Sequence, residues 1–209
     1  DCRWYLNEPE RGEIEYKSSH LAGSIFFDIE KVSDNLINLP HMFPPSEKFI
    51  DFAQNNGINI NDEIIIYDQE GYFSSTRVWF MFKLFGFKKI KILDGGMKDW
   101  CKQNLPLTDI IEKKPKSEFQ IDSFDSEGII TKRELEKLVV IKKKMMTIID
   151  ARSEKRFIGA QKEPRPNLRK GNIKHSINIP FKSIVNNNSY LKTIDELNDL
   201  MFYQNKINK

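Results

Sequence analysis

The sequence of 209 residues predicts an α/β protein made of two similar units in tandem, each a parallel sheet flanked by helices. One pattern occurs twice: an Asp-x-Arg anchor (Asp1, Asp150) is followed 23 or 26 positions later by a Ser-Ile pair (Ser24, Ser176). Short apolar runs also alternate with capped helical segments, as in α/β chains. A polar, irregular segment that reads as a linker separates the two copies. The predicted first domain, linker and second domain are residues 1–108, 109–128 and 129–209.

In the first unit, serine and glycine mark the ends of two helical segments, and two short apolar runs read as buried strands. A turn at Asp94–Gly96 opens a further short helix that runs through Trp100. In chain order, the other expected elements are a helix at Ser46–Gly57, a strand at Glu63–Tyr67, a helix at Ser74–Gly86 and a strand at Lys89–Leu93.

In the second unit, two helices are expected to begin with a capping box, in which a threonine is followed by glutamate three positions later. These pairs are Thr131 with Glu134 and Thr193 with Glu196. Between them, Thr147–Asp150 reads as a strand, followed by a long loop. The helix that begins at Thr193 corresponds to Ser46–Gly57 of the first unit, so the next element by analogy is the buried strand that carries the loop.

The loop that leaves the strand at Glu63–Tyr67 begins with Asp68 and opens a helix. Such a loop directs backbone N–H groups at one centre, which binds anions and lowers the pKa of a thiol. Asp68 is either a covalent nucleophile of aspartyl-phosphate type or part of a non-catalytic copy. The second interpretation is favoured because no metal-binding acidic cluster surrounds Asp68. The spacing of 44 positions from Ser24 to Asp68, repeated from Ser176, places the matching loop at about position 220, beyond Lys209.

Charge and composition argue against several classes of partner. The formal net charge is only +3, with 33 basic and 30 acidic residues, and the lysine clusters Lys113–Lys116 and Lys142–Lys144 read as solvated segments rather than a nucleic-acid or membrane patch. No apolar run reaches the roughly 20 residues of a membrane span. Two isolated cysteines, Cys2 and Cys101, read as packing residues and fit a reducing, cytoplasmic compartment. We therefore expect neither nucleic acid nor membrane as a partner.

Several ordered motifs resemble the two-domain sulfurtransferases, the rhodanese and 3-mercaptopyruvate sulfurtransferase family. These motifs are HLAGSIFFDIEKVSDNL, LPHMFP, YDQEGYFSSTRVWFMFKLFGF, ILDGGMKDW and DARSEKRF…EPRPNLRKG…SINIPF. The resemblance implies two rhodanese-like domains, of which only the second is catalytic and continues beyond Lys209. It implies no cofactor and no metal. The family's nucleophile is a cysteine in the loop of the second domain, and neither Cys2 nor Cys101 matches it.

The resemblance also implies an activity. A sulfane sulfur passes from 3-mercaptopyruvate or thiosulfate to the cysteine as a persulfide, and then to cyanide or to a thiol such as thioredoxin or glutathione. The alternative is a non-catalytic binding module of the rhodanese type. A phosphatase on the related fold would need a longer cysteine loop with an arginine, and nothing in the sequence supports it.

Four residues carry over from the family's motifs. Arg156 resembles the arginine that holds the carboxylate or sulfonate of the donor, and Arg165 resembles a second arginine found on the mercaptopyruvate side of the family. A guanidinium suits bidentate binding of a carboxylate; the alternatives are an ion pair within the domain for Arg156 and a surface charge for Arg165. His41 resembles a histidine proposed to act with an acid, here Glu30, and could relay a proton. The alternative for His41 is a structural role at the cleft between the domains.

Two further features qualify this interpretation. Arg152, beside Asp150 at a strand end, reads as structural. The sequence also departs from the family at two motifs: the usual Gly-His-Ile-Pro-Gly turn reads GNIKH (Gly171–His175), and the usual Pro-Glu-Pro reads KEP (Lys162–Pro164). Both departures lie in loops, so they bear on substrate preference more than on the fold.

Overall fold

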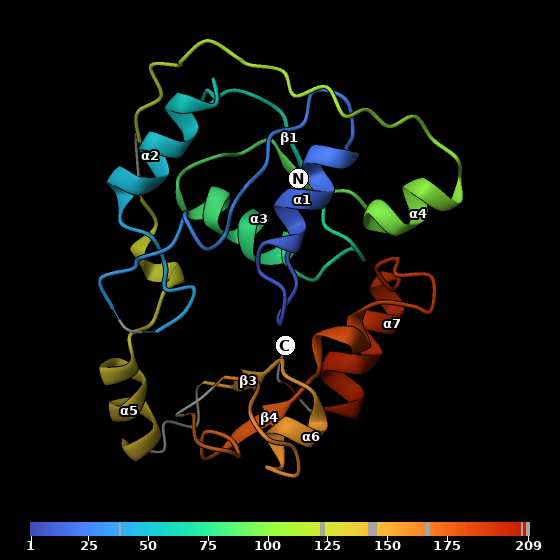
Figure 1. Ribbon diagram of the computed structural model, residues 1–209. Coiled ribbons are helices and arrows are strands. Elements are labelled where there is room, and N and C mark those ends of the chain that lie inside the picture. Colours follow the sequence, from blue (N-terminus) through green and yellow to red (C-terminus); the bar gives the residue numbers. More distant parts are fainter. Residues whose placement is uncertain (38, 122–123, 142–145, 166–167, 206, 208–209) are drawn as a thin grey trace. The chain divides into compact units, whose positions relative to one another are not determined.

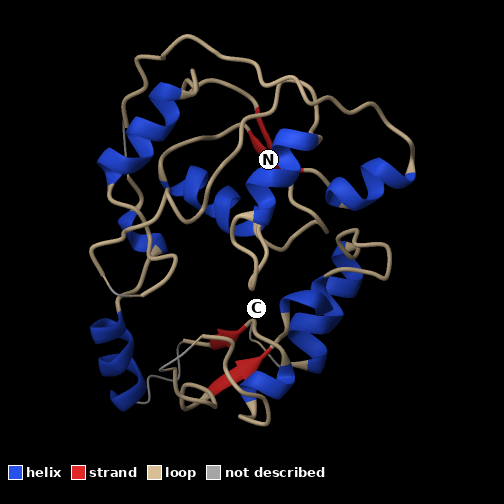
Figure 2. Cartoon of the chain, viewed as in Figure 1, coloured by secondary structure: helices blue, strands red, loops and turns tan. Residues whose placement is uncertain are grey.

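A computed structural model describes residues 1–37, 39–121, 124–141, 146–165, 168–205 and 207. The chain divides into two compact units, Asp1–Gly128 and Ile129–Lys209. Each unit contains a two-stranded parallel sheet accompanied by helices (Figures 1 and 2). The predicted α/β class with small parallel sheets is therefore confirmed.

The predicted elements form in the predicted order, with bounds that differ by a few residues. The elements of the first unit are α1 (Arg11–Ser18), α2 (Ser46–Asn55), β1 (Ile64–Ile66), α3 (Ser75–Leu84), β2 (Ile90–Ile92), α4 (Gly96–Lys102) and a 3-10 turn at Ser126–Gly128. Those of the second unit are α5 (Lys132–Ile141), β3 (Ile148–Asp150), α6 (Glu154–Phe157), β4 (Ser176–Asn178), a 3-10 turn at Phe181–Ile184, α7 (Ile194–Asn198) and a π-helical turn at Asp199–Gln204. Of these, α1, β4 and α6 were not predicted, and α6 interrupts the expected long loop.

The sheet of the first unit pairs β1 with β2 in parallel, with Ile65 opposite Lys91. Helix α3 packs against both strands (Figure 1). Ile66 is buried, but Ile65 is 58% exposed, so the expectation of a fully buried strand is only half right. Successive side chains of a strand point to opposite faces, and one face of this small sheet is uncovered at Ile65.

The core of the first unit is built largely from phenylalanine rings. Phe49 of α2 is fully buried and stacks on Phe85, with ring centroids 4.1 Å apart, and Phe82 of α3 meets its edge at 5.0 Å. Burying rings of this size supplies much of the hydrophobic stabilisation of a small unit. The aromatic residues at helical spacing in the sequence thus join α2 to α3.

The segment predicted as a linker, residues 109–128, packs along the first unit. Phe119 is buried in the phenylalanine core and stacks on Phe87 at 5.3 Å. The amide of Gln54 donates to the carbonyl of Phe119, and the backbone N–H of Ser117 donates to the carbonyl of Gln54. Lys113–Lys116 is exposed, whereas Lys142–Lys144 lies outside the described residues.

In the second unit, β3 pairs with β4 in parallel and both predicted capping boxes form. The Thr131 hydroxyl accepts from the backbone N–H of Glu134 at 3.3 Å, and the Glu134 carboxylate accepts from the backbone N–H of Thr131 at 2.7 Å. Thr193 and Glu196 repeat this reciprocal pair at 3.3 and 2.9 Å. Within the part of the chain that the structure describes, no helix has the length and apolar character needed to cross a bilayer.

Candidate functional site

The loop after β1 is closed by its own first residue. Asp68 has 0% exposed surface, and its carboxylate accepts hydrogen bonds from four backbone N–H groups. One oxygen accepts from Glu70 (3.0 Å) and Gly71 (2.5 Å), and the other accepts from Phe73 (2.8 Å) and Ser75 (2.9 Å). A carboxylate enclosed in this way cannot attack a substrate, so the geometry excludes the interpretation of Asp68 as a nucleophile. The four backbone N–H groups of the loop form an anion-binding site, here called the cradle, and the Asp68 carboxylate already occupies it.

A glycine turn fixes this cradle against α4. The backbone N–H of Met97 donates to the carbonyl of Asp68 at 2.8 Å. Gly96 has a φ of 57°, and a Cβ at this position would lie 2.5 Å from the backbone nitrogen of Gly71 and 2.8 Å from the carbonyl oxygen of Asp68. Only glycine fits both the backbone conformation and the space.

The two cysteines differ in their surroundings. The Cys2 thiol is buried and donates to the carbonyl of Tyr67 at 3.2 Å. Burial, with a smaller effect of the nearby Asp68 charge, raises the pKa of Cys2 to about 12, so it is no thiolate nucleophile. Cys2 is a packing residue, as predicted. Cys101 lies at the end of α4 and is exposed, so the same prediction is wrong for Cys101.

His41 and Glu30, eleven positions apart in sequence, form a hydrogen bond in the first unit. The His41 Nε2 atom lies 2.6 Å from Glu30 Oε1. The indole N–H of Trp4 donates to the same oxygen at 3.0 Å, and the Trp4 ring meets the His41 ring edge-on at 4.8 Å. The structure thus brings the two predicted residues together and adds Trp4, which sequence reasoning missed. Such an arrangement can hold a proton between His41 and Glu30.

Arg77 of α3 holds the turn that carries His41. Its Nη2 donates to the carbonyl of His41, which has an unusual φ of 55°. The Nε atom of Arg77 is buried without a hydrogen-bond partner among the described residues, and burial lowers the pKa of Arg77. A guanidinium in this position stabilises the strained turn and thereby the direction of the His41 ring.

Glu30 also lines a groove of about 640 Å³ beside α1. Its charged lining residues are Glu10, Glu13, Lys17, Asp28, Glu30 and Lys31. Both lysines pair with carboxylates of the groove. The excess of carboxylates makes this groove unsuitable for an anionic sulfur donor. Among the described residues, no cluster of three or more His, Cys, Asp or Glu side chains is placed to hold a metal ion.

In the second unit, Arg152 is fixed at the end of β3. Its Nε and Nη2 donate to the carboxylate of Asp150 at 2.9 and 2.5 Å, and Nη2 also donates to the carbonyl of Gly171 at 2.8 Å. These bonds lower the pKa of Asp150 and raise that of Arg152. The structural interpretation of Arg152 is therefore confirmed.

The same ion pairs continue to Arg156. Arg152 Nη1 donates to Glu163 Oε1 at 3.1 Å, and Arg156 donates to Glu163 Oε2 from Nε (3.1 Å) and Nη2 (2.5 Å). The hydrogen bonds from Arg156 are the main cause that lowers the pKa of Glu163. Asp150, Arg152, Glu163 and Arg156 form the second ion-pair network.

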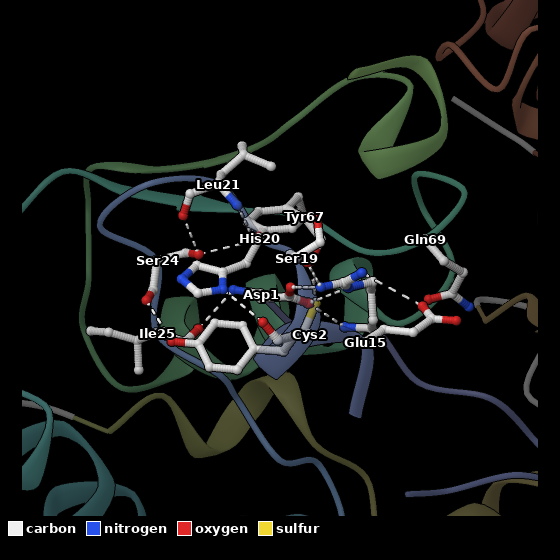
Figure 3. Close-up of polar contacts among 12 residues, drawn as sticks. Asp1, Cys2, Glu15, Ser19, His20, Leu21, Ser24, Ile25, Tyr67 and Gln69 are labelled. Carbon is white, nitrogen blue, oxygen red and sulfur yellow. Dashed lines mark hydrogen bonds and ion pairs between the residues drawn. The ribbon is translucent and has the colours of Figure 1, made fainter. Parts of the chain in front are cut away.

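The first unit contains an equivalent first ion-pair network (Asp1, Arg3, Glu15 and Arg11), part of which is visible in Figure 3. Arg3 donates to Asp1 through Nε and to the carbonyl of Ser19 through Nη2 at 2.7 Å, which matches the bond from Arg152 to Gly171. The Asp-x-Arg anchors of the two units therefore have the same geometry, as the repeated pattern predicts.

Arg165 follows Glu163 by two positions in the loop after α6 and is half-buried. Arg169, later in the same loop, is exposed. Arg156 and Arg165 thus lie on either side of Glu163 in the chain. A loop that carries this much positive charge can bind an anion such as a carboxylate.

Comparisons with known proteins identify the family. Residues 1–103 match the family described as the Rhodanese-like domain. The 3-mercaptopyruvate sulfurtransferase of Escherichia coli K12 is 37% identical over 188 residues, which cover 90% of this chain and 66% of that protein. The mouse 3-mercaptopyruvate sulfurtransferase is 34% identical over 210 residues, which cover 99% of this chain and 69% of that protein. The chain belongs to the 3-mercaptopyruvate sulfurtransferase family.

The fold agrees with this family. The crystal structure of SseA from Escherichia coli, described as a 3-mercaptopyruvate sulfotransferase with the rhodanese fold, superposes with a TM-score of 0.85 at 32% identity, over 98% of this chain and 76% of that one. The chain spans about two thirds of the length of the curated sulfurtransferases that it matches.

Sequence reasoning identified four residues of the candidate site and missed several of their partners. Arg77 holds the turn that carries His41, and Trp4 donates to the Glu30 oxygen that His41 contacts, although both are distant from His41 in sequence. Glu163 orients Arg156 from across an intervening loop. Only Glu163 had a signal, because it is the central residue of the family's Pro-Glu-Pro motif, here KEP.

Proposed function

We propose that the protein to which these residues belong is a sulfurtransferase that takes a sulfane sulfur from 3-mercaptopyruvate or thiosulfate. The proposal is supported by 34% identity to the mouse 3-mercaptopyruvate sulfurtransferase over 99% of the chain, together with Arg156 in α6 and Arg165 in the loop that follows α6. In the proposed reaction, a cysteine thiolate attacks the donor sulfur. An S–S bond forms as the donor's bond to that sulfur breaks, and the leaving enolate of a mercaptopyruvate donor takes up a proton. A thiol such as thioredoxin or glutathione, or cyanide, then removes the outer sulfur and restores the thiolate.

The cysteine is expected in the loop at about position 220, beyond Lys209, where the spacing of the repeats places the counterpart of Asp68. We further propose two rhodanese-like domains in tandem, at 1–108 and 129–209 with 109–128 between them, the second continuing past Lys209. The repeated ion-pair networks and the division into two units after Gly128 support this arrangement. The cytoplasmic location stays a prediction from cysteine usage.

In this proposal, Arg156 and Arg165 bind the carboxylate of the donor, and His41 with Glu30 moves a proton. Glu30 already holds His41 at 2.6 Å, and Glu163 already orients Arg156. A second arginine favours an α-keto acid over thiosulfate, because a planar carboxylate accepts a bidentate guanidinium.

The experiment begins with the residues that follow Lys209. A cysteine directly after a β-branched run is expected, and any other residue there would favour a non-catalytic rhodanese-type binding module. Turnover of 3-mercaptopyruvate and thiosulfate is then compared in the full-length protein and in Arg165→Ala. The mercaptopyruvate rate is expected to fall at least about tenfold, with a smaller change for thiosulfate. Arg169→Ala, an exposed arginine of the same loop, is the matched control. An unchanged mercaptopyruvate rate in Arg165→Ala would contradict the role of Arg165.

A further inference from the structure

Arg156 is held along one edge of its guanidinium. Nε and Nη2 both donate to Oε2 of Glu163, at 3.1 and 2.5 Å. Nη1 has no hydrogen-bond partner among the described residues, and the side chain keeps 27% of its surface exposed. Glu163 thereby fixes one edge of the guanidinium and leaves the other edge for a ligand.

Glu163 is itself a rigid anchor. Its side chain is only 4% exposed, and its second oxygen accepts from Arg152 at 3.1 Å. Arg152 is in turn fixed to Asp150 at the end of β3 and to the carbonyl of Gly171. Because hydrogen bonds from Arg156 lower the pKa of Glu163, the carboxylate stays ionised at neutral pH. The orientation of the Arg156 guanidinium is thus fixed relative to β3 through two intermediate side chains, Arg152 and Glu163.

The first unit shows what the same network is like without this rigidity. Glu15 occupies the place of Glu163 but is 30% exposed, and its contact with Arg3 is longer, at 3.5 Å. Arg11, the counterpart of Arg156, is 46% exposed. An exposed pair of this kind fixes a side chain weakly. The Asp1–Arg3 anchor is more buried than the Asp150–Arg152 anchor, but the carboxylate that joins the two arginines is better buried and more closely bonded in the second unit, which carries the proposed donor arginines.

We propose that Glu163 is a positioning residue that aims the free edge of Arg156 at the carboxylate of the sulfur donor. This inference rests on the proposed function, in which Arg156 binds the donor. Glu163 does not touch the donor, since both of its oxygens are occupied by arginines. Its contribution is the geometry of Arg156, because a binding group displaced by about 1 Å loses much of its interaction with the substrate.

The test uses Glu163→Gln in the full-length protein, with Glu15→Gln as the matched control in the first network. Glu163→Gln is expected to raise the KM for 3-mercaptopyruvate about tenfold, with a smaller change in kcat. Glu15→Gln is expected to change KM less than about twofold. The sign of the change in KM is informative, because removing a negative charge beside an anion site would by itself lower KM. An increase therefore reports the lost orientation of Arg156.

Two further variants separate the possible failures. If Arg156→Ala leaves KM unchanged, the proposed role of Arg156 fails, and the inference about Glu163 fails with it. If Arg156→Ala raises KM but Glu163→Gln leaves it unchanged or lowers it, only the inference about Glu163 is overturned. Should Glu163→Gln fail to fold, Glu163→Asp keeps the charge but shortens the side chain by one methylene. Glu163→Asp is expected to raise KM in the same way, and an unchanged KM would overturn the inference.

Discussion

Replacing Asp68 tests whether the carboxylate in the loop after β1 stabilises the first unit. Four backbone N–H groups donate to this buried carboxylate. In Asp68→Ala all four lose their acceptor, and at about 1 kcal/mol for each orphaned donor the loss of unfolding free energy is about 4 kcal/mol. We use the low end of the usual range because water can enter the space left by the side chain. Asp68→Asn keeps one oxygen, so about half of this loss is expected.

The assay is urea unfolding at pH 7, followed by tryptophan fluorescence. Trp4, Trp79 and Trp100 are the three tryptophans of the sequence, and all belong to the first unit, so the signal reports that unit. Glu70→Gln, an exposed carboxylate of the same loop, is the control and is expected to cost less than about 0.5 kcal/mol. A loss below about 1 kcal/mol in Asp68→Ala, or equal losses in Asp68→Asn and Glu70→Gln, would refute the reasoning.

Two other predictions concern stability. Hydrogen bonds from arginine lower the pKa values of Asp150 and Glu163 in the folded protein. The stability that these two carboxylates confer is therefore fully present above their unfolded-state pKa values of about 4, and it is lost as the pH falls from there through the lowered, folded-state values. Circular dichroism during urea unfolding from pH 6 to pH 2.5 should show this loss, and Glu163→Gln should reduce it; an unchanged pH dependence would contradict the prediction. Phe49→Ala is expected to cost about 3–5 kcal/mol, because the ring is fully buried between Phe82 and Phe85. Phe80→Ala, at a partly exposed position of α3, should cost much less, and similar losses in the two variants would argue against a core centred on Phe49.

Local signals predicted most of the fold. The capping boxes at Thr131 and Thr193 depend on residues three positions apart, and both form. The apolar runs at β1 and β2 likewise predicted a parallel pair. Side-chain environment was harder to predict, because it depends on what lies across from each residue. The exposure of Ile65 follows from the size of the sheet, and the packing of Phe119 follows from the path of the chain over the core.

In the candidate site, too, residues within family motifs could be predicted, whereas partners that lie far away in the sequence could not. Glu30 and His41 were predicted as partners from their place in family motifs, and they form a hydrogen bond. Trp4 reaches the same carboxylate from 26 positions away, with no local signal to indicate it. Arg156 was recognised by resemblance, but the orientation that Glu163 gives it depends on the path of the intervening loop.

The carboxylate of Asp68 has a practical consequence for experiments on this protein. Because it is tethered to the loop, it occupies the cradle at a very high effective concentration compared with any dissolved ion. Sulfate, phosphate or thiosulfate from a buffer must displace it to enter, and gains no extra donor by doing so. A rise in melting temperature on adding these anions therefore reports binding elsewhere in the molecule.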